Sequence, residues 1–283
     1  YNMGENIMKK VIQILIILAV ALMATACGTQ PKLPAQSKSE QSKKVTEGNT
    51  FENIKKQGVL KIAVDDTFPP MEYRDDQNKL VGFDIDLANA ISKELGVKVE
   101  FIPTAWDGIL PGLDAKRYDI IMSSMNITDE RKQKVDFVEY MKLGQVVAVK
   151  SGNPQKIQSK EDLSGKIVGV QLGSTSESAA KEIKGIKELK TYNGYTDVFN
   201  DLGLGRLQGV IVAEAVGRYY KTTKPDAFDV VGSSFQSLPV GIAVRKGDDE
   251  LEAALQKAIA SVKDNGDYAE VSKKWFGTDK SKE

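Results

Sequence analysis

Short apolar runs alternate with amphipathic segments along the chain from residue 51 onward. Short, mostly apolar runs of three to six residues predict buried strands, whereas apolar residues at helical spacing predict helices. The expected strands span 59–64, 97–102, 120–122, 167–171, 189–192, 210–212 and 228–231. The expected helices span 85–95, 107–113, 129–134, 176–183, 197–204, 214–221 and 248–265, with one more ending at 275–277. We expect Asp84 and Thr128 to be N-caps, and Gly96 to end the first of these helices.

This alternation begins again after Asn153-Pro154, which predicts an α/β fold with two lobes. Two apolar segments, 145–149 and 240–244, have no helical partner, and we expect them to be paired crossovers that join the lobes. Lobe 1 would then hold residues 51–140 and 240–283, and lobe 2 residues 141–239. Ligands of open α/β sheets bind at the carboxyl ends of strands, and the polar residues that follow strands here are Asp65, Ser123, Ser124 and Gln171.

The first 50 residues have a different pattern. Lys9 and Lys10 precede an apolar run at 11–23, which is too short to span a bilayer but suits a signal peptide. Ala24-Thr25-Ala26 and Cys27 follow, and this arrangement resembles a bacterial lipoprotein signal, although Ala24 stands where Leu is usual. We expect residues 1–26 to be a signal peptide that is cleaved before Cys27, and Cys27 to carry acyl chains such as palmitate. The alternative is plain secretion with cleavage after Ala26. The polar residues 27–50 predict a flexible, lipid-anchored tether.

Composition excludes several classes of function. The 283 residues contain 39 Lys and Arg against 39 Asp and Glu, so a protein that mainly binds nucleic acid is not expected. Histidine is absent, which excludes Ser-His-Asp chemistry and most transition-metal sites. A single cysteine excludes an internal disulfide and multi-cysteine metal sites. We therefore expect no metal and no cofactor, and a site built from carboxylates, Arg, hydroxyls, amides and aromatic rings.

Two segments have the chemistry of an anion site. Arg131 lies near the start of the helix that Thr128 caps, where its guanidinium can bind a carboxylate through two hydrogen bonds. The alternative is a surface ion pair with Asp129 or Glu130. Residues 171–176, QLGSTS, lie between a strand and a helix, so Gln171, Ser174 and Thr175 lie beside free backbone N–H groups that suit the same carboxylate. No Gly-Lys-Ser/Thr follows, so this segment is not a P-loop.

Seven segments, in order over residues 51–279, resemble the extracytoplasmic solute-binding proteins of polar amino-acid ABC importers. They are VDDTFPPMEY (64–73), VGFDIDLANAI (81–91), AWDGILPGL (105–113), MSSMNITDERKQKVDF (122–137), GKIVGVQLGST (165–175), PVGIAVRKGDDEL (239–251) and KKWFGTD (273–279). The resemblance implies a type II periplasmic-binding-protein-like fold whose lobes close on an amino acid. It also implies delivery to an ABC permease in the membrane, and we expect a monomer that is not an enzyme.

The resemblance also implies roles for single residues. Arg131 would bind the α-carboxylate of the ligand, and Ser124 and Asn126 would offer groups to the carboxylate and the ammonium. Phe68 and Trp106 would sandwich the ligand side chain, and Asp65 would contact its distal end. Acids at 65 and 66 beside these rings favour arginine or lysine, although glutamine or cystine fits the same frame.

One position departs from the family. The Asp that normally pairs with the α-ammonium aligns with Ala213, and the acid follows one residue later, at Glu214. Three explanations stay open. Glu214 reaches back and substitutes for the missing acid, or the ligand lacks a free α-ammonium or has it bound by Asp65 or Asp66. In the third, the protein is a sensor or a weak binder and not a transport protein. A dehydratase-type enzyme resembling these proteins, with Glu214 as its acid or base, is the rival from another class.

Overall fold

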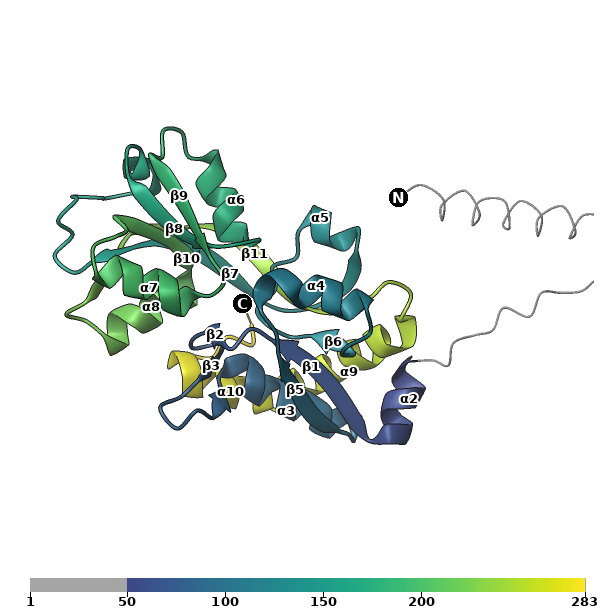
Figure 1. Cartoon of the computed structure of the whole chain (residues 1–283). Helices are drawn as coiled ribbons and strands as arrows, with labels where there is room; N and C mark the ends of the chain where they lie inside the picture. The colour runs from purple at the N-terminus through teal and green to yellow at the C-terminus, as the bar shows by residue number, and fades with distance from the viewer. Residues whose placement is uncertain (1–49, 283) are drawn as a thin grey trace, which may run out of the picture. The chain divides into compact units, whose positions relative to one another are not determined.

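The computed structural model describes residues 50–282, and its main feature is one eight-stranded sheet shared by two lobes (Figure 1). The strand order is β5-β1-β6-β11-β7-β10-β8-β9. The strands of this sheet are β1 (Val59–Val64), β5 (Lys98–Pro103), β6 (Ile120–Ile121), β7 (Val135–Lys150), β8 (Ile167–Gln171), β9 (Glu188–Tyr192), β10 (Gly209–Ala213) and β11 (Phe228–Arg245). A small antiparallel sheet contains β2 (Thr67–Phe68), β3 (Glu72–Arg74) and β4 (Leu80–Val81).

The two long strands β7 and β11 connect the lobes. They pair antiparallel along most of their length; β6 pairs with the last part of β11, and β10 with the last part of β7. The two expected crossover segments do lie in these paired strands, but they are not paired with each other: 145–149 lies opposite residues of 228–235, and 240–244 lies opposite residues of 136–141. The separate strands expected at 228–231 and 240–244 are wrong, because one continuous strand with register shifts joins them. Two of the register shifts fall among the mostly polar residues between 231 and 238, which gave no strand pattern in the sequence. The lobe boundaries predicted from the sequence fall within this strand pair and stay a prediction.

Helices cover both faces of the sheet in each lobe. Leu60, Ile62 and Val64 of β1 pack into one buried apolar cluster, and Ala63 packs into another on the opposite face. In β10, Val210 and Val212 pack into one buried apolar cluster and Ile211 packs into another. Because both faces of these strands are buried, their sequences are nearly continuous apolar runs. The helices are α2 (Thr50–Gln57), α3 (Phe83–Leu95), α4 (Trp106–Asp114), α5 (Asp129–Lys132), α6 (Thr175–Glu182), α7 (Tyr195–Gly203), α8 (Glu214–Thr223), α9 (Asp249–Asp264) and α10 (Asp267–Phe276), with a 3₁₀ turn at Lys160–Leu163.

The start of α3 corrects one prediction. Asp84 is not the N-cap, because the helix begins at Phe83 and Gly82 precedes it with φ 143°. The N–H groups of Phe83 and Asp84 donate to the carbonyls of Pro70 and Met71 at 2.9 Å each. Because carbonyl groups of the preceding loop accept from these two N–H groups, the Asp84 carboxyl does not cap the helix. It can instead bind groups in the protein interior. Thr128 does cap α5, and its Oγ1 accepts from the Arg131 N–H at 3.2 Å.

The predicted signal peptide (1–26), Cys27 and nearly all of the predicted tether (27–50) lie outside the described residues. Within residues 50–282, none of the helices has the length and apolar character that crossing a membrane requires.

Candidate functional site

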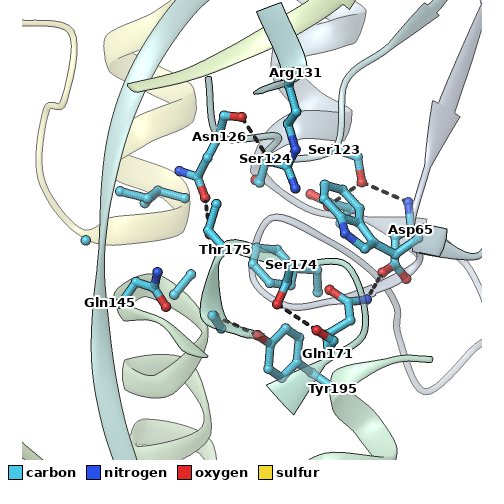
Figure 2. A pocket seen from close by; sticks show the side chains of 17 residues that line it. Asp65, Ser123, Ser124, Asn126, Arg131, Gln145, Gln171, Ser174, Thr175 and Tyr195 are labelled. Atoms are coloured by element: carbon cyan, nitrogen blue, oxygen red, sulfur yellow. Dashed lines mark hydrogen bonds between the residues drawn. The ribbon is translucent and has the colours of Figure 1, made fainter. Parts of the chain in front are cut away.

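A cavity lies where the two lobes meet. Strand ends and helix starts of both lobes supply its walls. In Figure 2 the labelled side chains of the two lobes face one another across it. The lining residues are Asp65, Phe68, Glu72, Trp106, Ser123, Ser124, Asn126, Arg131, Leu143, Gly144, Gln145, Gln171, Ser174, Thr175, Ser176, Tyr195 and Ala213.

Hydrogen bonds across the cavity hold the lobes together. Thr175 Oγ1 donates to Asn126 Oδ1 at 2.8 Å, and Trp106 Nε1 donates to the Gly173 carbonyl at 3.2 Å. On the far side, the Gln171 amide donates to the Asp65 carboxylate. Each bond joins α4, the residue after β1 or the segment before α5 to a residue between the end of β8 and the start of α6. The structure is therefore closed over the cavity.

Arg131 is the cation of this site. Its side chain is buried, with 8% exposed. One guanidinium nitrogen donates to the Asn126 carbonyl at 2.9 Å and another to the Gly173 carbonyl at 3.2 Å, and the guanidinium carbon lies 5.3 Å from the Trp106 ring centre. Burial lowers its pKa to about 10, so it stays charged at neutral pH.

No carboxylate within residues 50–282 forms an ion pair with Arg131. The surface pairing that the sequence left open is excluded, because Asp129 pairs with Lys132 and Glu130 with Lys134. A buried charge that has only carbonyl partners is costly. These two bonds use two of the five guanidinium N–H donors, and the others can bind an anion.

The first turn of α6 faces the same space. Ser174 caps this helix, and its Oγ accepts from the Glu177 N–H at 3.1 Å. The N–H groups of a first helical turn have no acceptor within the helix, and the helix dipole favours an anion there. Thr175 and Ser176, which begin the helix, both line the cavity. Arg131 and the first residues of this helix therefore line the same cavity and both carry N–H donors.

Asp65 is the opposite charge in the cavity. It is 4% exposed and follows β1. Burial raises the pKa of its carboxyl, and hydrogen bonds from Thr67 and Gln171 lower it in part. Its neighbour Asp66 does not line the cavity and instead accepts from Arg74 Nε at 2.7 Å. The phenyl ring of Phe68 lies 5.5 Å from that of Tyr195, so an aromatic wall stands beside the acid.

Two further carboxyl groups lie side by side below the cavity. Asp84 accepts from the N–H and Oγ of Ser124, at 2.7 and 3.0 Å, and from the Tyr140 hydroxyl at 2.8 Å. Burial raises its pKa to about 6. Burial and the neighbouring Asp84 charge hold the pKa of Glu72 well above its ordinary value. Glu72 Oε2 has no donor facing it among the described residues, as expected where two carboxyl groups meet and one keeps its proton.

The structure brings almost all of the predicted site residues to one cavity. These are Asp65, Phe68, Trp106, Ser124, Asn126, Arg131, Gln171, Ser174 and Thr175. Their contacts with a ligand stay a prediction.

Comparison with known proteins identifies the family. The sequence profile of the bacterial extracellular solute-binding proteins, family 3, matches residues 60–278. The chain belongs to this family. The solute-binding protein is 36% identical over 231 residues to the L-cystine-binding protein TcyJ of Escherichia coli (strain K12), covering 81% of this chain and 86% of the relative.

Solved structures agree with this family and with a two-lobed, periplasmic-binding-protein-like fold. An ancestral arginine-binding protein bound to arginine matches with a TM-score of 0.75 and 45% identity, over 78% of this chain and 99% of that chain. The ancestral amino acid-binding protein AncCDT-1, a precursor of cyclohexadienyl dehydratase, matches with a TM-score of 0.76 and 43% identity, over 80% and 99%.

Glu214 of the solute-binding protein is not brought to the cavity, and this corrects its predicted place. Ala213 ends β10 and lines the cavity, whereas Glu214 begins α8 and lies outside the lining. The Glu214 carboxylate accepts from Arg218 Nε at 2.7 Å, one helical turn away. The backbone turns from strand to helix between these two residues, which sends adjacent side chains in different directions.

Sequence reasoning did not propose Glu72, Gln145, Ser176 or Tyr195 as site residues. Gln145 had a usable signal, since it is the polar residue at the start of the apolar run QVVAV. Nothing in the sequence indicated Glu72, because an acid in a Pro-rich loop is expected to be exposed. Only the tertiary fold buries it completely.

Proposed function

We propose that this protein captures a polar amino acid outside the cytoplasm and delivers it to an ABC permease. The observation that carries the proposal is Arg131, a buried guanidinium that faces a cavity between two lobes and has no carboxylate partner within residues 50–282. An amino acid supplies the missing carboxylate, and the start of α6 offers it further donors. Family membership and the ligands named for the relatives support the same function.

The first experiment is a thermal-shift panel of the proteinogenic amino acids and L-cystine, followed by calorimetry. A ligand at a hundred times its Kd stabilises the native state by about 2.7 kcal/mol, which shifts the melting temperature measurably. A panel without any shift would contradict the proposed function.

Arg131 is then tested by conservative replacement. Arg131→Lys keeps the charge but loses the two-pronged geometry, at a cost of about 1.5–3 kcal/mol, or roughly ten- to a hundredfold in Kd. The matched control is Arg206→Lys, whose side chain is 64% exposed and pairs with Asp201 on the surface. Equal affinities for both variants would remove Arg131 from the site.

We propose a basic amino acid as the preferred ligand, with glutamine and cystine as the alternatives. Asp65 is a buried carboxylate, and the rings of Phe68 and Trp106 line the same cavity. A cationic side chain satisfies both the charge and the rings. The panel decides this point, because a protein that binds only neutral amino acids would contradict the preference.

We also propose that Cys27 is lipidated after cleavage of residues 1–26 and anchors the protein to the outer face of the cell membrane. The sequence pattern supports this, as does the extracytoplasmic character of the family. Palmitate should not be incorporated into the Cys27→Ala variant in cells, and this variant should be released from the membrane fraction. Labelling that persists in this variant would contradict the anchor.

We propose binding and not catalysis, in a protein that acts as a monomer. The named relative binds cystine, and AncCDT-1 is described as an amino acid-binding protein although it is a precursor of a dehydratase. The dehydratase alternative depended on Glu214, which lies outside the cavity lining and pairs with Arg218. That observation removes the reason for assigning an acid–base role to this residue.

A further inference from the structure

Gln145 is a buried polar side chain in the cavity wall to which no role is yet assigned. It lies in β7, between apolar residues, and is 4% exposed. Its side-chain oxygen Oε1 is buried and has no hydrogen-bond partner among the described residues. Since a buried acceptor without a donor costs free energy, such an atom calls for an explanation.

The orientation of this amide follows from its neighbours. The carboxylate Oε2 of Glu182 accepts from Gln236 Nε2 at 3.1 Å, which turns the oxygen of Gln236 the other way. That oxygen then accepts from Gln145 Nε2 at 3.4 Å. Because a carboxylate is only an acceptor when ionised, this chain of bonds sets the amide of Gln145 with Nε2 toward Gln236. Oε1 is left as the atom that can accept a bond elsewhere.

The sheet register places Gln145 beside the position that departs from the family. Ala213 of β10 lies directly opposite Gln145 of β7 in the antiparallel ladder. Residues opposite one another in such a ladder have side chains on the same face, about 4.5–5.5 Å apart at Cβ. Both residues line the cavity. The side chain opposite the methyl group of Ala213 in the sheet therefore carries a neutral acceptor, Gln145 Oε1.

We propose that Gln145 Oε1 accepts a hydrogen bond from the α-amino group of the ligand, in place of the carboxylate that Ala213 lacks. The inference rests on the proposed function, since it assigns a contact within the same site. It makes Gln145 a specificity-determining residue and gives the amino group a neutral partner. Because the amino group has this neutral partner, Asp65 is left to serve a cationic side chain.

The test compares each amino acid with its desamino analogue, which keeps the carboxylate and side chain but has hydrogen in place of the amino group. The probes are L-arginine, L-glutamine and L-cystine with their desamino analogues, measured by calorimetry on the full chain. Gln145→Leu should weaken binding of the amino acid roughly ten- to a hundredfold. It should change binding of the desamino analogue less than about threefold, because that probe has no group for Gln145 to contact.

A second variant tests the same assignment in the opposite direction. Ala213→Asp places a carboxylate beside Gln145 and should strengthen amino-acid binding about tenfold or more. Combined with Gln145→Leu, it should restore most of the lost affinity. The control is Gln256→Leu, at a position on α9 that does not line the cavity.

The outcomes separate the two proposals. If the wild-type protein binds none of the three amino acids, the proposed function fails and the role of Gln145 fails with it. If an amino acid binds but Gln145→Leu weakens it and its desamino analogue by the same factor, only the contact with the amino group is overturned. Failure of Ala213→Asp to recover binding in the Gln145→Leu background would likewise contradict the assignment.

Discussion

The two buried carboxyl groups below the cavity predict an unusual dependence of stability on pH. Glu72 and Asp84 are both 0% exposed, and both have raised pKa values in the folded protein, which for Asp84 is about 6. The folded state thus holds protons that the unfolded chain releases. The contribution of these two groups to stability is then fully present near pH 4 and falls as the pH rises, which is the reverse of what a paired surface carboxylate gives.

The magnitudes follow from the shifts. For Asp84, a rise from 3.8 to about 6 corresponds to about 3 kcal/mol, lost between pH 4 and pH 6. For Glu72, the free energy of unfolding falls by about a further 1.4 kcal/mol for each pH unit above the ordinary pKa of a glutamate over which the folded state keeps the proton. Glu72→Gln removes this second loss, because an amide mimics the protonated acid: Oε1 can still accept from Ser123 Oγ, and Nε2 can donate to Asp84.

The assay is urea unfolding of the ligand-free protein at half-unit steps from pH 4.5 to 8. Wild type and Glu72→Gln should have similar free energies of unfolding near pH 4.5 and then diverge, with the variant the more stable at pH 8. Glu139→Gln, at an exposed position of β7 in the same lobe, is the control and should follow wild type. Parallel curves for Glu72→Gln and wild type, differing by less than about 1.4 kcal/mol across the range, would refute the reasoning.

Three further predictions test the scaffold around the cavity. Gly82→Ala should cost at least about 3 kcal/mol in urea unfolding, because a Cβ at φ 143° would lie 2.1 Å from the Met71 carbonyl oxygen; Gly96→Ala, where the nearest atom is a flexible lysine end at 3.7 Å, should cost only about 1 kcal/mol. Tyr140→Phe should destabilise by about 1.5–3 kcal/mol, since Asp84 loses a buried hydroxyl donor, and an unchanged free energy of unfolding at pH 7 would show that this bond contributes nothing. Trp106→Phe keeps a ring but removes the hydrogen bond from Nε1 to the Gly173 carbonyl. The affinity for the amino acid that binds best in the panel should therefore fall about two- to tenfold. A calorimetric Kd equal to that of wild type would contradict a role for this bond in closure.

Local patterns in the sequence were sufficient for most of the secondary structure and for much of the site. The apolar runs and Gly96 placed β1 and α3, since strand length, helical spacing and a left-handed C-cap act within a few residues. The capping of α5 by Thr128 is equally local, because the accepted N–H is three residues away. The QLGSTS segment was recognisable because an anion site needs specific groups at a helix start, whereas for Arg131 the spacing left a surface ion pair open and the family resemblance favoured the ligand role.

What the sequence alone determined is therefore the set of elements and the residues at their ends. The tertiary structure decided which of those residues face one another. Glu214 lies outside the cavity although its neighbour Ala213 lines it, since a strand-to-helix turn separates adjacent side chains. Gln145 enters the site through its register with Ala213 in a partner strand more than 60 residues away in the chain. Glu72 and Asp84 meet as a buried pair for the same reason: a pKa depends on the charges and the solvent that folding places around a group, and no local pattern encodes these.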